Sequence, residues 1–171
     1  MRIEPIRTER LVLRGFTKED ARFAISIWND KDMGQYLPDE SMDEITEEYL
    51  QLVENLGEDK KCCYLIAESK DTKERIGTCS FIPNEDGTVY DLAYCVHREF
   101  WRQGYATEMA KGMIDYAKSQ GAKKAIIFIN QENVASNKVA QKLGFAVVGE
   151  KTYLKRGTNL TFKDYKYEKE I

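Results

Sequence analysis

The organisation of this chain follows from one run, VHREFWRQGYATEMAKGMIDYA, at residues 96–117. An apolar strand breaks at Arg98, and Gly104 and Ala106 then open a helix. Small residues at such a junction let a ligand approach the backbone, and the unpaired N–H groups of a first helical turn attract an anion such as phosphate. Any strand-to-helix loop can carry glycine, so this junction alone does not establish a phosphate site.

The predicted helix is amphipathic. Apolar residues recur at three- and four-residue spacing, and charged residues take the other positions. Gly121 follows as the residue that ends the helix. The apolar set is Ala106, Met109, Ala110, Met113, Ile114 and Ala117.

A second run, INQENVASNKVAQKLGF at residues 129–145, stands directly after a predicted strand at 125–129. Together the two runs resemble the GNAT superfamily of acyl-CoA N-acyltransferases. The core pattern of that family is Q/R-x-x-G-x-G/A, followed about one helix and one strand later by N-x-x-S/A and K-x-G-F. The opening TERLVLRGFTKEDA, at 8–21, is similar to the RimJ/RimL-like branch, typified by ribosomal-protein-alanine N-acetyltransferases. The resemblance runs from Glu9 to about Tyr167.

The expected fold is mixed α/β, with a single N-acetyltransferase domain over residues 1–171. A mostly antiparallel sheet of about seven strands is combined with about four helices. The central strand–helix–strand unit requires one parallel pair, and the resemblance implies that this pair splays apart for the cofactor. Strands are expected at 10–15, 62–69, 76–82, 89–96, 125–129, 145–154 and 160–168. Helices are expected at 18–28, at 43–57 behind a Ser41-x-x-Glu44 capping box, after Gly104, and at 135–143.

Composition limits the function classes. The 171 residues are 42% hydrophobic, which suffices for one core, and no Pro- or Ser-rich linker or repeat divides them. We expect a cytoplasmic protein without membrane contact, since no apolar run approaches about 18 residues and no cleavable signal is seen. Four cysteines without CxxC spacing predict neither a metal site nor a disulfide framework.

The charge pattern argues against nucleic acid as a partner. The formal net charge is −3, and no predicted face carries a stripe of Lys and Arg. Basic residues of the last two strands alternate with aromatics and are expected on a solvated face; they are Lys151, Lys155, Arg156 and Lys163. A mildly acidic surface suits a cationic amine, whether a peptide N terminus, a polyamine or an amino-sugar.

The resemblance implies acetyl-CoA as co-substrate. Its pantetheine arm is expected to pair with Cys95 and Val96 and to bond Asn133 and Asn137. Its pyrophosphate is expected over the loop after the strand, formed by Arg102, Gln103, Gly104, Tyr105, Ala106 and Thr107. The first motif position, often Gln or Arg, is Trp101 here. Backbone donors provide most of such a grip, so this departure is minor.

Two residues are candidates for proton transfer in aminolysis of a thioester. Asp91 takes the acidic position of the family's E-x-G-Y pattern and is the candidate base. The alternative is a solvated carboxylate at a strand edge. Ser136, three residues after Asn133, is the candidate donor to the leaving thiolate, since Ala140 stands where other branches carry a Tyr. Both Ser136 and Asn133 are also ordinary helix caps. A backbone N–H near Val96 would meet the oxyanion.

Other residues are weaker candidates. A Cys95–His97 dyad is disfavoured, because side chains two residues apart on a strand are roughly 6.5 Å from each other. His97 is expected beside the cofactor loop instead. Trp28, Tyr36 and Leu37 fall where the family's substrate-facing helices lie, although a small satellite core explains them equally well.

The expected function is transfer of an acetyl group from acetyl-CoA to a primary amine, without a covalent enzyme intermediate. The acceptor is either a protein α-amine, as in the resembled branch, or a small molecule. A catalytically silent acyl-CoA-binding module is the alternative. A P-loop protein is disfavoured, because the Gly-Lys-Ser/Thr ending is missing. A homodimer is among the expected assemblies, as dimers are frequent in the resembled branch.

Overall fold

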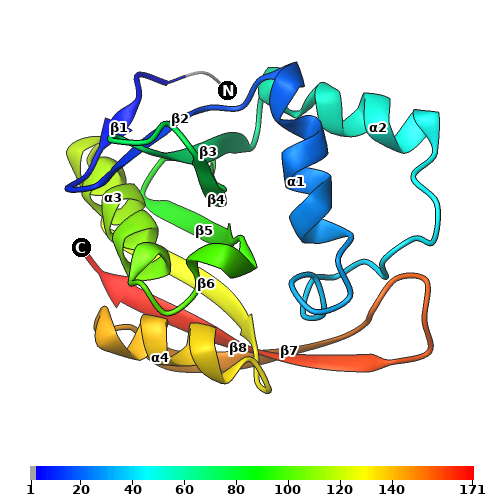
Figure 1. Ribbon diagram of the computed structural model, residues 1–171. Helices are drawn as coiled ribbons and strands as arrows, with labels where there is room; N and C mark the ends of the chain where they lie inside the picture. The colour runs from blue at the N-terminus through cyan, green and yellow to red at the C-terminus, as the bar shows by residue number, and fades with distance from the viewer. Residues whose placement is uncertain (1–2) are drawn as a thin grey trace.

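A computed structural model describes residues 3–171. In that part of the chain one eight-stranded sheet has the strand order β1-β2-β3-β4-β5-β6-β8-β7, with helices on both of its faces (Figure 1). The strands are β1 Ile6–Arg7, β2 Leu11–Gly15, β3 Cys63–Ser69, β4 Arg75–Pro83, β5 Val89–Val96, β6 Lys124–Asn130, β7 Ala146–Leu154 and β8 Thr161–Glu170. The α-helices are α1 Ala21–Trp28, α2 Glu47–Glu54, α3 Tyr105–Ser119 and α4 Val134–Lys142. None of the helices within residues 3–171 has the length and apolarity needed to cross a bilayer.

The mixed α/β prediction is confirmed, with two corrections. The sheet has one more strand than expected among the described residues, because the short β1 pairs with β2. The second helix begins at Glu47 and not at residue 43. Thr46 caps it by accepting the N–H of Tyr49 at 3.2 Å. The main chain of Met42, in the expected capping box, is instead bonded on both sides to the Asn29 amide.

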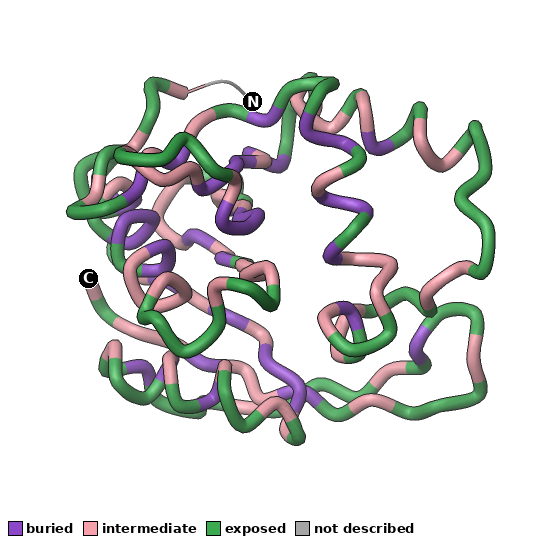
Figure 2. Tube along the Cα trace, in the orientation of Figure 1, coloured by how far each residue is buried: buried purple, intermediate pink, exposed green. Residues whose placement is uncertain are grey.

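Two apolar clusters occupy opposite faces of the sheet. Neighbouring residues Leu65 and Ile66 of β3 point to opposite faces and belong to different clusters. The larger cluster lies under α3 and α4, and the smaller lies under α1 and α2. Figure 2 shows the inward side of α3 as buried. Met109 and Met113 there are 0% exposed, which confirms the periodicity found in the sequence.

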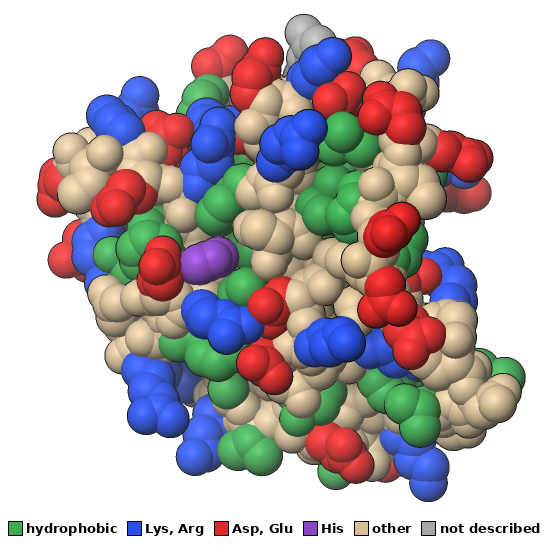
Figure 3. Space-filling model, turned by 45° about the vertical axis from the view of Figure 1, so that its right-hand side comes forward, with side chains coloured by type: hydrophobic (Ala, Val, Ile, Leu, Met, Phe, Trp, Pro, Cys, Tyr) green, Lys and Arg blue, Asp and Glu red, His purple; other side chains and the backbone are tan. Residues whose placement is uncertain are grey.

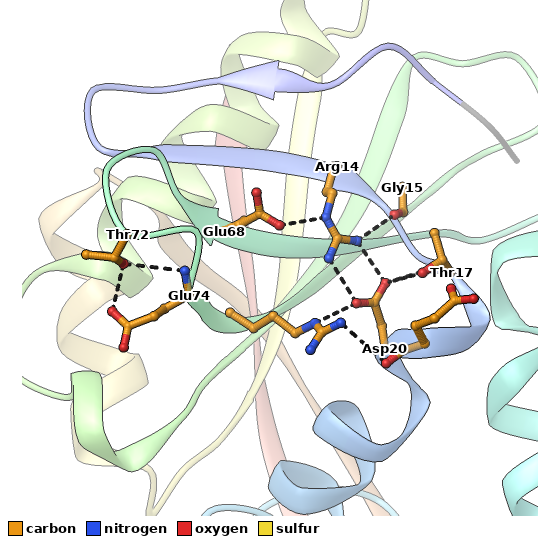
Figure 4. Close-up of polar contacts among 9 residues, drawn as sticks. Arg14, Gly15, Thr17, Asp20, Glu68, Thr72 and Glu74 are labelled. Carbon is orange, nitrogen blue, oxygen red and sulfur yellow. Dashed lines mark hydrogen bonds and ion pairs between the residues drawn. The ribbon is translucent and has the colours of Figure 1, made fainter.

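The start of α1 is held by a buried ion cluster (Figure 4). The fully buried carboxylate of Asp20 accepts hydrogen bonds from both terminal guanidinium nitrogens of Arg14, at 2.8 and 2.9 Å, and from Nε of Arg75 at 2.8 Å. Burial alone would raise the pKa of Asp20, but the bonds from Arg14 and Thr17 outweigh it and lower the pKa to about 2. Because Arg14 is on β2 and Arg75 on β4, the cluster fixes α1 to the sheet.

Candidate active site

The parallel strands β5 and β6 diverge after a short paired segment. They pair only from Val89↔Lys124 to Asp91↔Ile126, while β5 continues to Val96 and β6 to Asn130. Beyond Asp91 the side of β5 that faces β6 is therefore left without a neighbouring strand. This gap confirms the predicted splayed pair.

The register of β5 decides which of its main-chain groups face the gap. The N–H of His97 donates to the carbonyl of Ile76 at 3.0 Å. Antiparallel ladders alternate, so the backbone of Cys95 also faces β4, while Tyr94 and Val96 direct theirs towards the gap. Any pairing of a ligand with this strand therefore involves Tyr94 and Val96 and not, as the sequence suggested, the main chain of Cys95.

Trp101, the residue that departs from the family pattern, lies at the same edge. Its indole Nε1 donates to the carbonyl of Val96 at 2.7 Å. The carbonyl of Val96 is thus already bonded, and the N–H of Val96 is the group that it presents to the gap. The aromatic side chain fixes the end of β5 against the loop that follows.

The loop after β5 and the first turn of α3, residues 102–107, have the backbone that the predicted diphosphate site requires, and this segment is called the anion loop below. Arg102 and Gly104 both have left-handed backbone, with φ of 61° and 83°. These two residues turn the chain so that α3 begins at Tyr105 with its N-terminus at the loop. The first N–H bonded within the helix belongs to Glu108, which donates to the carbonyl of Gly104. The N–H groups of residues 105–107 precede it and are available to an anion.

Arg10, which the sequence analysis missed, joins this loop to the N-terminal strands. Its Nη1 donates to the carbonyl of Gln103 at 3.0 Å, and its Nε donates to Glu108 at 2.7 Å. Its guanidinium lies 4.2 Å from the ring centroid of Tyr105, and Nη2 lies 3.5 Å from where a Cβ at Gly104 would stand. Burial alone would raise the pKa of Glu108, but bonds from Thr8 and Arg10 outweigh it and lower that pKa.

The N-terminus of α4 carries the candidate donor. Asn133 is the N-cap of α4, and its Oδ1 accepts the N–H of Ser136 at 3.1 Å. Of the two residues that the sequence offered as helix caps, Asn133 is therefore the one that caps the helix. The hydroxyl of Tyr94 reaches the carbonyl of Ser136 at 3.5 Å, and burial raises the pKa of Tyr94 to about 12. Tyr94 thus places a second, protonated hydroxyl beside Ser136. Tyr94 takes the Tyr position of the same E-x-G-Y pattern in which Asp91 takes the acidic one, so the sequence contained a signal for it.

Asn137 is bonded inside the protein. It is 8% exposed, and its Nδ2 donates to the carbonyls of Asn130 and Asn133 at 3.0 and 2.8 Å. Its Oδ1 accepts the hydroxyl of Tyr167 at 2.8 Å. These contacts hold the connection between β6 and α4. A direct bond from Asn137 to the pantetheine arm stays a prediction.

Asp91 is a carboxylate with a shifted proton affinity. Burial raises its pKa to about 6, against the opposing attraction of Lys151 and Lys166. Strand alternation places Asp91 on the α1/α2 face of the sheet, together with Ala93 and Cys95. The raised pKa suits a group that takes up a proton near neutral pH, and a role for Asp91 as the base stays a prediction.

A pocket of about 960 Å³ opens on this α1/α2 face. Its floor includes Ala93 and Cys95, and its walls include Trp28 and Leu37. The sequence left these two wall residues open between a substrate-facing place and a satellite core, and Trp28 also packs against the smaller apolar cluster. The pocket therefore lies beside the end of β5, on the face opposite α3 and α4. Burial raises the pKa of the Cys95 thiol to about 11, so at neutral pH this thiol on the floor of the pocket is uncharged.

A strap formed by residues 35–40 closes one side of the pocket. Arg156, in the β7–β8 turn, forms an isolated bridge with Asp39 and a two-point ion pair with its carboxylate. Lys155 was expected on a solvated face, which is wrong: it is 8% exposed and its Nζ donates to the carbonyl of Gln35 at 2.7 Å. Figure 1 shows the β7–β8 hairpin extending beneath α1 to meet this connection.

Two expected residues border these features. The hydroxyl of Tyr36 donates to the carbonyl of Glu132 at 3.3 Å, which links the strap to the start of α4. His97 packs beside Phe23, with ring centroids 6.0 Å apart, and caps the short 3-10 turn that leads into the anion loop. Within residues 3–171 no group of three or more His, Cys, Asp and Glu side chains is placed to hold a metal ion.

Comparison with known proteins identifies the family. Residues 10–146 match the family model described as the acetyltransferase (GNAT) domain. The chain belongs to the GNAT acetyltransferase family. It is similar to the uncharacterized N-acetyltransferase p20 of Bacillus licheniformis, with 28% identity over 86% of this chain and 85% of that relative.

Two solved acetyltransferase structures share the fold. One is spermidine N-acetyltransferase from Vibrio cholerae in complex with CoA and spermine, with a TM-score of 0.81, 18% identity, and coverage of 94% of this chain and 95% of the other. The other, from Salmonella typhimurium, modifies the N-terminal serine of ribosomal protein L7/L12; its TM-score is 0.80, its identity 18%, and the coverage 98% and 99%. These two relatives act on chemically different amines.

Proposed function

We propose that the protein is an N-acetyltransferase that moves the acetyl group of acetyl-CoA directly to a primary amine. The carrying observation is the gap between β5 and β6, which has the anion loop at one end and the acceptor-side pocket on the opposite face. Two substrates that approach from different faces meet at such a gap. Family membership supports the reaction class, and the neighbours solved with CoA support the donor.

The main chain fits the donor. N–H groups at the start of α3 suit a diphosphate, and the left-handed Gly104 lets it approach. The gap-facing main chain of Tyr94 suits an amide-bearing arm, because two amides can extend a strand's ladder. Arg10 adds a cation whose Nη2 lies next to Gly104.

Four groups of the chain would carry the chemistry. Acetyl-CoA, when bound, supplies a thioester whose carbonyl an amine can attack and whose thiolate leaves. Asp91, with its pKa of about 6, would take the proton that the attacking nitrogen loses, directly or through water. The N–H of Val96 would donate to the carbonyl oxygen as negative charge develops there. The hydroxyl of Ser136 or Tyr94 would give a proton to the departing sulfur and regain one from water.

Amine-dependent thiol release tests this proposal. Purified protein with acetyl-CoA is given a panel of primary amines, and free thiol is followed by absorbance. We expect release that depends on the amine and falls with Ser136→Ala. Binding of acetyl-CoA by calorimetry without release for any amine would favour the acyl-CoA-binding module instead. Loss of binding altogether would remove the donor from the proposal.

A further inference from the structure

The pocket on the α1/α2 face restricts which amine this protein acetylates. This inference rests on the proposed function, since it concerns the acceptor of that reaction. Its volume of about 960 Å³ suits a small molecule or a few residues of peptide. The two kinds of acceptor differ in one physical respect: a peptide brings an N–H and a C=O with every residue, and each needs a partner once buried.

The floor of the pocket has no free main chain for a peptide. Thr78 and Ser80 belong to β4, which is paired along its length with β3 on one side and β5 on the other. Ala93 and Cys95 of β5 exchange their main-chain bonds with β4 in the same ladder. Recognition of a peptide by strand addition requires an open strand edge, and this floor presents side chains only.

Part of the main chain beside the strap is also bonded. The carbonyl of Pro38 accepts the N–H of Arg156 at 2.8 Å, and the N–H of Glu40 donates to the carbonyl of Arg156 at 2.9 Å. Further along, the N–H and carbonyl of Met42 are both bonded to the Asn29 amide, at 2.6 and 2.8 Å. These four main-chain groups hold this side of the pocket in place and are not free to pair with a peptide.

The walls of the pocket present aromatic side chains. The rings of Trp28, Tyr49 and Tyr64 line the pocket. The Trp28 indole is fixed by its bond to Thr78 Oγ1 at 3.0 Å. Burial raises the pKa of Tyr64 to about 12, so its hydroxyl stays neutral. Aromatic faces favour apolar stems and cations over peptide amides.

The mouth of the pocket is acidic. Asp39 is neutralised by Arg156, but across residues 3–171 neither Glu40 nor Asp43 is held in an ion pair. Lys31 is the one other cation among the pocket's lining side chains in the described part of the chain, so two carboxylates face one lysine. Figure 3 shows acidic side chains beside apolar surface on the right-hand side of the molecule.

From these observations we infer that the acceptor is a small primary amine whose reactive nitrogen is carried on an apolar stem, with a second positive charge at the far end. The stem lies against the aromatic walls, and the second charge lies at Glu40 and Asp43. A protein N terminus is a poor acceptor, because its peptide groups would be buried without partners along the floor, where the main chain is already paired.

Three acceptors test this inference by thiol release from acetyl-CoA: cadaverine, n-pentylamine, and a short peptide that begins with serine. Cadaverine and pentylamine share one stem, and cadaverine adds a second cation that is also a second reactive amine, which by itself doubles kcat/KM. We expect kcat/KM for cadaverine to exceed that for pentylamine by about 4- to 20-fold, since two exposed ion pairs supply about 2- to 10-fold beyond the statistical factor. Pentylamine should in turn exceed the peptide.

Paired variants locate the second charge. Glu40→Gln combined with Asp43→Asn should bring the ratio of kcat/KM for cadaverine to that for pentylamine close to the statistical value of about two. Glu44→Gln, an exposed acid of the same connection outside the pocket lining, should leave the ratio unchanged. A ratio that moves equally in both proteins would overturn the assignment of the two carboxylates.

The two proposals fail in distinguishable ways. Transfer that prefers the peptide over both small amines overturns this inference and leaves the acetyltransferase intact. Acetyl-CoA binding without transfer to any of the three acceptors also counts against the inference, and the wider amine panel then decides the proposed function. Absence of acetyl-CoA binding removes the proposed function itself.

Discussion

Replacing Arg10 with glutamine should weaken donor binding while leaving the chemistry intact. Arg10 bonds the carbonyl of Gln103 and the carboxylate of Glu108, with 41% of its side chain exposed. Bonds of a half-exposed cation are worth about 0.5 to 1 kcal/mol each. Losing two of them lets the anion loop relax by about 1 to 2 kcal/mol, which corresponds to a roughly 5- to 30-fold rise in the dissociation constant.

Titration calorimetry with CoA measures this rise in the dissociation constant directly. Two controls separate a loss of diphosphate binding from a general effect of removing a cation. S-acetylpantetheine carries no diphosphate, so kcat/KM for this truncated donor should stay within about twofold of wild type if only diphosphate binding is lost. Lys124→Gln removes a cation of similar exposure, 38%, whose partner Glu168 lies on β8; its CoA affinity should be unchanged. Equal loss with both donors, or unaltered CoA affinity alongside a lowered melting temperature, would refute a role for Arg10 in holding the loop.

Three further outcomes follow from the site and its surroundings. Ser136→Ala and Tyr94→Phe should each lower kcat, and the double variant should lower it by about 100-fold or more. In steady-state kinetics, KM for acetyl-CoA should change little. A double variant with undiminished kcat would contradict proton donation by either hydroxyl. Asp91 acts as a base only when ionised, so kcat/KM should fall about tenfold per pH unit below its pKa of about 6, and this acid limb should be missing from the residual activity of Asp91→Asn. Asp20 has a pKa lowered from 3.8 to about 2, so it contributes about 2 kcal/mol of stability above pH 4 that is lost as pH falls towards 2; urea unfolding across this range should show the loss in wild type and a flatter profile in Asp20→Asn.

The anion loop and the main elements were predictable because their determinants are local. Gly104 and Ala106 are close in sequence, and a strand, a small-residue turn and a periodic helix are each recognised over a few residues. The start of α2 was predicted wrongly for a related reason. Ser41 and Thr46 are both suitable caps, and the choice fell to Thr46 because the Asn29 amide holds Met42 outside the helix.

Contacts between segments that are distant in the sequence could not be predicted from a local pattern. Arg10 and Gln103 are 93 positions apart, so nothing in either run marks the bond between them. Lys155 looks like one more surface lysine until its ammonium is found on the carbonyl of Gln35, 120 positions away. Tyr94 was visible in its motif, but its place beside Ser136 depends on how α4 packs against β5.

The amino-acid order by itself determined the family and the class of fold, because these depend on short-range spacing. It also predicted a site for an anion, from N–H groups that every helix start exposes. The tertiary structure decided which strand residues face the gap, how the strap closes the pocket and which acids remain unpaired there. Those outcomes depend on register and on side chains brought together by folding, and a single sequence does not encode them as a local pattern.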